Sequence, residues 1–161
     1  MYLLDAEVLL DLRHAQDGAP LASWAQRVSR QAMFVSALSL VELENAAERA
    51  QKQSKTAGAG WRAWIDAQLL PAFEGRIVPV DQAVARRRAS LAIEADRDAL
   101  LAATALVHGL TLVTFHPAAF RTARLKLLDP SRAAPEGTDD GDWREATRGR
   151  APWLRNLFIR G

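Results

Sequence analysis

Short apolar segments of strand length alternate with longer helical patterns along most of this chain. The apolar segments occupy residues 1–5, 32–36, 76–80, 110–114 and 124–128. Helical periodicity covers residues 6–14, 20–30, 39–54, 61–74, 82–95 and 98–108. Strands separated by helices favour right-handed crossovers between parallel strands. We therefore predict a three-layer α/β/α fold with a mostly parallel central sheet.

The composition limits the class of protein. The chain has 161 residues, which suits one well-buried core better than two. It has no cysteine, so disulfides and thiolate metal sites are excluded. No apolar run reaches the roughly 18 residues of a membrane span, and the first residues do not have the pattern of a signal peptide. These features predict a soluble, cytoplasmic protein without a membrane segment.

A change in composition after Asp129-Pro130 predicts the end of the compact domain. Residues 131–141 are rich in turn-forming residues, which predicts a domain at 1–130 and a linker with a C-terminal tail at 131–161. Arginines alternate with aromatic and aliphatic residues in 143–161. We expect this tail to pack on the domain or to contact another protein. Contact with RNA is the second possibility, and a disordered tail without a role is the structural alternative. The glycines of Ala57-Gly58-Ala59-Gly60 predict a flexible break between two helices.

Three acidic residues fall where predicted strands end and helices begin. Asp5 closes the first strand, Glu42 follows the second, and Asp98 opens the last helical pattern. Parallel sheets bind ligands at the carboxyl ends of their strands. Each acid also has a structural interpretation, because Asp5 and Asp98 suit helix N-caps and Ser39-Leu-Val-Glu42 matches a capping box.

Convergence of these acids on one edge of the sheet favours a metal site. At about 5 Å and an effective dielectric constant near 20, each pair of carboxylates repels by about 3 kcal/mol. A bound divalent cation removes this repulsion. Oxygen ligands without cysteine select Mg²⁺ or Mn²⁺, which in such sites act on phosphodiesters. We therefore predict that Asp5, Glu42 and Asp98 bind such an ion.

Five segments of the chain resemble the successive blocks of PIN-domain ribonucleases, the VapC/FitB-like toxins of bacterial toxin–antitoxin pairs. The segments are YLLDAEVLLDL, VSALSLVELENAAE, LLPAFEGRIVPVD, DALLAATALVHGLTLVT and RLKLLDP, and together they span about residues 1–130. The resemblance implies a PIN fold, Mg²⁺-dependent RNA cleavage, a homodimer and inhibition by a small antitoxin protein. Asp5, Glu42 and Asp98 match the family's metal-site acids.

Small polar residues behind this site suit supporting positions. They are Ser36, Thr104 and Thr114. The family resemblance suggests such positions for Ser36 and Thr104, and hydrogen bonding within the core is the alternative for both. Arg13, Arg86 and Arg87 are candidates for a basic rim that binds RNA, and a solvated helix face is the alternative for them.

Two departures from the family pattern leave the activity open. The family usually begins Leu-Asp-Thr-Asn, whereas this chain has Ala6 and Glu7 at the last two positions. The family's fourth acid is absent, and Phe115-His116 lies near its place. Either Glu7 and His116 rebuild the metal site, or the domain is a degenerate, catalytically weak or silent module that binds protein or RNA.

Overall fold

The computed structural model describes residues 1–15 and 19–132, and within these ranges the strands form one fully parallel sheet. The strand order is β3-β2-β1-β4-β5. The strands are β1 (Tyr2–Leu4), β2 (Met33–Ser36), β3 (Ile77–Val78), β4 (Thr111–Val113) and β5 (Leu127–Leu128). This confirms the predicted α/β class with a mostly parallel sheet.

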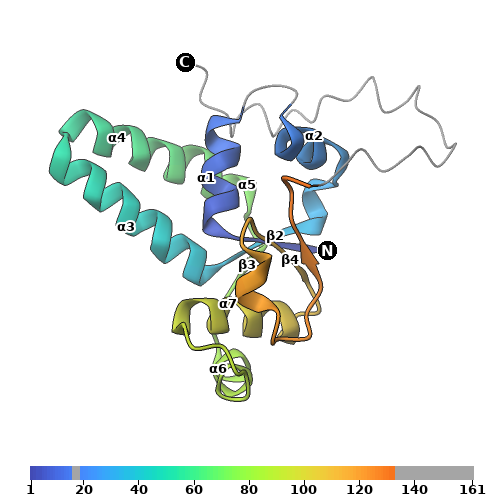
Figure 1. Cartoon of the computed structure of the whole chain (residues 1–161). Coiled ribbons are helices and arrows are strands. Elements are labelled where there is room, and N and C mark those ends of the chain that lie inside the picture. The colour runs from blue at the N-terminus through green and yellow to red at the C-terminus, as the bar shows by residue number, and fades with distance from the viewer. Residues whose placement is uncertain (16–18, 133–161) are drawn as a thin grey trace, which may run out of the picture.

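Helices connect the strands and cover both faces of the sheet. The α-helices are α1 (Ala6–His14), α2 (Pro20–Arg27), α3 (Ala37–Gln53), α4 (Lys55–Trp64), α5 (Leu70–Ala72), α6 (Gln82–Ala89) and α7 (Asp96–Val107). Short helical turns add η1 (Arg30–Ala32), the π-helical η2 (Ile65–Leu69) and η3 (Pro117–Phe120). In Figure 1, helices α1 to α5 lie on one side of the sheet, and α6 and α7 lie on the other.

Alternating side chains of the strands build two separate cores. Leu4 and Val113 pack into a cluster with residues of α1 to α4, including Leu43. Their neighbours Leu3 and Leu112 point to the opposite face and pack with residues of α7 and η3. Successive residues of a strand face opposite sides, so a strand buried on both faces must be continuously apolar. This is why the first strand could be recognised in the sequence.

The strand order reverses beside β1. The chain adds β2 and β3 on one side of β1 and then returns to add β4 and β5 on the other. Such a switch point leaves a crevice beyond the carboxyl ends of the two strands that diverge from it, here β1 and β4. Asp5 follows β1, and Thr114 follows β4. The topology therefore places both residues at this crevice.

Two helix starts differ from those the sequence indicated. Helix α3 begins at Ala37, because the Ser36 hydroxyl caps it by accepting a hydrogen bond from the Leu38 amide at 3.2 Å. The capping-box interpretation of Ser39 and Glu42 is therefore wrong, and the buried Ser39 hydroxyl has no hydrogen-bond partner among residues 1–15 and 19–132. Helix α7 begins at Asp96 rather than at Asp98, so Asp98 lies in its first turn and does not cap it.

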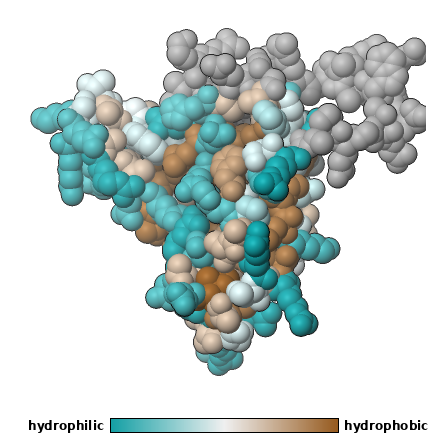
Figure 2. Space-filling model, in the orientation of Figure 1, coloured by the Kyte–Doolittle hydropathy of each residue, from teal (hydrophilic) through white to brown (hydrophobic). Residues whose placement is uncertain are grey.

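The predicted break at residues 57–60 is also wrong. These residues lie within α4, and the break between α3 and α4 occurs at Ser54, whose hydroxyl accepts a hydrogen bond from the Ala57 amide. Gly58 is required by packing, because a Cβ atom there would lie 2.5 Å from the Cβ atom of Gln51 on α3. In Figure 2, hydrophilic residues cover the outer end of this helix pair.

Two sequence predictions concern membrane crossing and the tail. In the part of the chain that the structure describes, no helix is both long and apolar enough to cross a bilayer. The predicted linker and tail, 131–161, lie outside the described residues apart from Ser131 and Arg132.

Candidate functional site

Asp5 is the innermost residue of the site. It lies between β1 and α1, and its side chain is 1% exposed. Its backbone nitrogen donates to the carbonyl oxygen of Val113 at 3.1 Å, which ties the end of β1 to β4. Asp5 occupies the N-cap position of α1, but its carboxylate makes no capping hydrogen bond. The carboxylate accepts a hydrogen bond from the Thr114 hydroxyl at 2.8 Å instead, so it faces the crevice.

Helices α3 and α7 bring two further acids to the same place. Glu42 comes from the second turn of α3, and Asp98 comes from the first turn of α7. Their side chains are 31% and 23% exposed. Together with Asp5 they form a set that we call the acidic cluster. The three carboxylates predicted from the sequence thus converge from three separate elements.

The cation at the centre of the acidic cluster is Arg97, which sequence analysis did not single out. Its Nε atom donates to Glu42 Oε1 at 2.6 Å, and its Nη2 atom donates to Glu42 Oε2 at 3.0 Å. Its Nη1 atom donates to Asp98 Oδ1 at 2.9 Å and to Asp5 Oδ2 at 3.5 Å. A further bond joins Nη2 to Asp5 Oδ1. One guanidinium therefore binds all three acids.

This arrangement stabilises the charged form of Arg97. Burial alone lowers the pKa of the guanidinium, but hydrogen bonds to Glu42, Asp5 and Asp98 more than compensate. The net effect raises the pKa of Arg97 above its ordinary value. Arg97 is therefore a permanent positive charge among three carboxylates.

The acidic cluster supplies the right donor atoms for a hard cation, but its present geometry does not fit one. Mg²⁺ requires oxygen ligands at about 2.0–2.1 Å. The acids are instead spaced around a planar guanidinium, mostly at hydrogen-bonding distances of 2.6 to 3.5 Å from its nitrogen atoms. Within residues 1–15 and 19–132, no group of three or more His, Cys, Asp or Glu side chains is placed to share an ion. Arg97 stands where a metal would be expected.

A surface pocket of about 630 Å³ opens next to Arg97. Its polar lining includes Glu42, Arg49, Arg97 and Asp98, and its apolar lining includes Leu10, Leu43 and Phe120. Glu7 and His116 also line it, and the Nε2 atom of His116 lies 2.7 Å from Glu7 Oε2. Both side chains are more than half exposed. The two substitute ligands proposed from the sequence therefore pair with each other at the rim.

The three supporting residues take different places. Thr114 contacts Asp5 directly, as described above. Ser36 caps α3, and the Thr104 hydroxyl donates to the Leu100 carbonyl oxygen at 2.8 Å within α7. Each hydroxyl forms a hydrogen bond with a nearby backbone atom, which agrees with the alternative of hydrogen bonding within the core.

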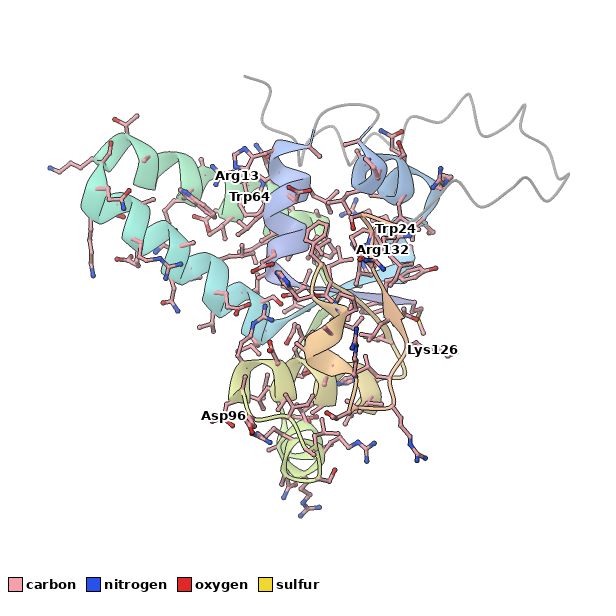
Figure 3. The ribbon with its side chains drawn as sticks, viewed as in Figure 1. Arg13, Trp24, Trp64, Asp96, Lys126 and Arg132 are labelled. Atoms are coloured by element: carbon pink, nitrogen blue, oxygen red, sulfur yellow. The ribbon has the colours of Figure 1, made fainter. Side chains whose placement is uncertain are left out.

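The prediction that Arg13 belongs to an RNA-binding rim is wrong. Arg13 is only 6% exposed, and its guanidinium carbon lies 4.1 Å from the ring centroid of Trp61 and 5.1 Å from that of Trp64. Figure 3 shows Arg13 beside Trp64 between α1 and α4. Burial lowers the pKa of this guanidinium, and the two rings offset part of that cost by cation–π attraction.

The other two predicted rim arginines are exposed but lie apart from the site. Arg86 and Arg87 are in the last turn of α6, on the far side of α7 from the sheet. Neither is among the described residues that line the surface pocket. Their exposure agrees with a solvated helix face and leaves RNA contact as a prediction.

Comparison with known proteins assigns the family. The model of the family described as "PIN domain" matches residues 2–125, which include every member of the acidic cluster. This chain is a PIN domain. The assignment agrees with the parallel α/β fold, which resembles that of FitAcB.

Several known proteins resemble this PIN domain along most of their length. VapC ribonuclease Y4jK of Sinorhizobium fredii is 27% identical over 140 residues, which cover 81% of this chain and 97% of that protein. Toxin FitB of Neisseria gonorrhoeae is 27% identical over 138 residues, which cover 81% and 98%. The crystal structure of FitAcB from Neisseria gonorrhoeae superposes with a TM-score of 0.75 at 27% identity and covers 82% of this chain and 99% of that one.

Two arginines at the PIN-domain site carried weak signals in the sequence. Arg49 follows Glu42 by seven residues on α3, a spacing that returns to the same helix face. Arg97 directly precedes Asp98, and the run Asp96-Arg97-Asp98 reads as an ordinary solvated helix start. Its contacts with Glu42 and Asp5 depend on residues 55 and 92 positions away, so only the fold could identify them.

Proposed function

We propose that this PIN domain is the toxin of a toxin–antitoxin pair and that it cleaves RNA phosphodiesters in the cytoplasm. One of its relatives carries the name VapC ribonuclease, and another carries the name Toxin FitB. The observation that carries the proposal is the acidic cluster, in which acids from the end of β1, from α3 and from α7 converge on one positive charge at the switch point of the sheet.

The proposed cofactor is Mg²⁺ or Mn²⁺, which Asp5, Glu42 and Asp98 would hold after Arg97 has left. If bound, the ion would supply polarisation of the phosphoryl oxygens and compensation of the charge that develops during hydrolysis. The residues of the chain supply position and charge. Thr114 fixes the Asp5 carboxylate by a hydrogen bond, and Asp5 cannot turn away because it is buried. Glu7 and His116 remain the proposed substitutes for the missing fourth acid.

The side of the surface pocket that Arg49 lines suits a phosphate-bearing substrate. Arg49 is exposed on α3 and lines the pocket next to Glu42. A guanidinium binds phosphate oxygens in a bidentate manner. We therefore assign Arg49 to the RNA backbone, which places the scissile phosphate between Arg49 and the acidic cluster.

The proposed partners are a small antitoxin protein and a second copy of this chain. Among the solved structures that resemble this fold, one is FitAcB from Neisseria gonorrhoeae and another is a toxin–antitoxin complex from Klebsiella pneumoniae. For this chain, the proposal predicts growth arrest on expression. Co-expression of the cognate antitoxin should relieve that arrest.

RNA cleavage by the purified full-length chain tests the proposal. We expect cleavage of a labelled RNA in Mn²⁺ or Mg²⁺ and none in EDTA, and we expect Asp98→Asn to lower the rate at least 100-fold. Asp96→Asn is the matched control, because Asp96 lies two residues away on α7 and pairs with Arg88 outside the site, near α6 (Figure 3). Equal rates for the two variants, or cleavage that persists in EDTA, would count against the proposed chemistry.

The position of Arg97 favours a second candidate function. In this candidate, the ion pairs of Arg97 with the three acids are permanent, so no metal ion enters. The domain then binds protein or RNA and does not cleave RNA. This candidate predicts that neither the wild-type chain nor Arg97→Gln cleaves RNA in any divalent metal. Binding to RNA or to the antitoxin would then persist without hydrolysis.

A further inference from the structure

The guanidinium of Arg97 uses its full hydrogen-bonding capacity on the acidic cluster. A guanidinium has five N–H donors. The structure gives Arg97 five hydrogen bonds, of which two go to Glu42, two to Asp5 and one to Asp98. Paired contacts of this kind are among the stronger interactions between side chains. The guanidinium of Arg97 therefore lies between the three carboxylates and donates hydrogen bonds to each of them.

The acids cannot hold both this guanidinium and a metal ion in their present positions. Five of the six carboxylate oxygens of the cluster already accept a hydrogen bond from Arg97, whose guanidinium lies between them. An ion would need the same oxygens at a shorter distance and around one point. Binding of a divalent cation therefore requires Arg97 to leave. Three carboxylates against one guanidinium leave an excess of negative charge, so a cation still gains from entering the pocket.

Arg97 has a way out of the cluster. Its side chain is 34% exposed and lines the surface pocket, whereas Asp5 is buried behind it. The residue is the second of α7, so a change in its side-chain torsions moves the guanidinium into the pocket without unwinding the helix. Side chains occupy a small set of staggered rotamers, and the pocket that Arg97 lines has a volume of about 630 Å³.

We propose that Arg97 is a built-in competitor of the metal ion, which holds the acidic cluster closed until a divalent cation displaces its guanidinium. This inference rests on the proposed metal-dependent function and adds a control of metal binding within the chain itself. The effect of Arg97 on metal affinity distinguishes a competitor from an ion pair that only stabilises the fold. An ion pair that only stabilises the fold leaves metal affinity unchanged or lowers it when broken, whereas loss of a competitor raises metal affinity.

Calorimetric titration of Mn²⁺ into the EDTA-treated, full-length chain tests the proposal. Arg97→Gln should bind Mn²⁺ at least tenfold more tightly than the wild type. Arg97→Lys keeps a cation that can compete and should bind with an affinity closer to the wild type. Arg88→Gln removes an arginine that pairs with Asp96 outside the site and should bind like the wild type. Equal Mn²⁺ affinity in Arg97→Gln and the wild type would overturn the proposal.

Loss of folding in the variant would still give an answer. If Arg97→Gln is unfolded in EDTA, addition of Mn²⁺ should refold it, because a ligand that binds only the native state stabilises that state. Failure of millimolar Mn²⁺ to restore the circular dichroism of the folded protein would overturn the proposal. The Mn²⁺ affinity of Arg97→Lys can then be compared with that of the wild type, and it should be only slightly higher.

RNA cleavage separates this inference from the proposed function. An Arg97→Gln variant that binds Mn²⁺ more tightly but cleaves no RNA supports the competitor role and counts against the nuclease. A wild-type chain that cleaves RNA with the same Mn²⁺ affinity as Arg97→Gln supports the nuclease and overturns the competitor role.

Discussion

Replacement of Arg97 by glutamine should destabilise the metal-free protein by about 2 kcal/mol. The main cost falls on Asp5, because its carboxylate is 1% exposed and, among the described residues, would keep the Thr114 hydroxyl as its one side-chain partner. Glu42 and Asp98 are partly exposed and can be rehydrated. Loss of one partner from a buried ion pair costs about 3–5 kcal/mol, and we reduce this figure because Arg97 is itself one-third exposed.

Urea unfolding and thermal unfolding in EDTA measure this effect. A loss of about 2 kcal/mol should lower the midpoint temperature by about 4–8 °C for a chain of this size. Arg62→Gln is the matched control, because Arg62 also joins two glutamates, Glu44 and Glu48, but on the surface. It should be far less damaging, since exposed ion pairs contribute little.

A double variant tests the physical reason for this loss. Asp5→Asn removes the charge that Arg97→Gln leaves unpaired, so the two changes together should cost less than the sum of the single changes. Additive losses, or a loss in Arg97→Gln no larger than that in Arg62→Gln, would refute the argument that a buried carboxylate depends on this guanidinium.

Three smaller perturbations probe the elements around the site. Thr114→Val removes the hydroxyl that donates to Asp5 and should cost about 1–3 kcal/mol in urea unfolding, whereas Thr114→Ser should cost less; equal losses would contradict this. Gly58→Ala places a Cβ atom 2.5 Å from Gln51 Cβ and should cost about 1–3 kcal/mol. Gly60→Ala meets nothing within 4 Å and should be neutral or stabilising, and the opposite order of the two variants would refute the packing argument. Arg49→Ala should weaken RNA binding and reduce its salt slope by about 0.7, and an unchanged slope would remove Arg49 from the RNA contact.

The fold was predictable from the sequence because its strands are buried on both faces. Residues such as Leu3 and Leu4 face opposite cores, so the strand segments read as continuous apolar runs. The ends of the helices were harder to predict from the sequence. The glycines at 58 and 60 suggested a break, but close packing of α4 on α3 explains Gly58. A local pattern cannot distinguish a glycine that ends a helix from one that allows two helices to meet.

The sequence predicted the acids of the site and the supporting Thr114, but not the cation that binds the acids. Asp5, Glu42 and Asp98 follow or precede strands whose carboxyl ends meet at one edge, so topology alone brings them together. The partner that satisfies them could not be predicted. Arg97 reaches across the fold to Asp5, and Arg13 turns inward onto two tryptophan rings. An arginine has a long side chain, so its position in the sequence does not decide whether it faces solvent or a buried partner.

A crystal soaked in Mn²⁺ gives the decisive observation, because the anomalous signal locates the ion and the same map shows Arg97. We predict a peak between the carboxylates of Asp5, Glu42 and Asp98, with the Arg97 guanidinium moved into the surface pocket. A map of the soaked wild type and of Arg97→Gln in which neither shows an ion at the acidic cluster would contradict the metal site. An ion bound there with Arg97 still in place would contradict its role as a competitor.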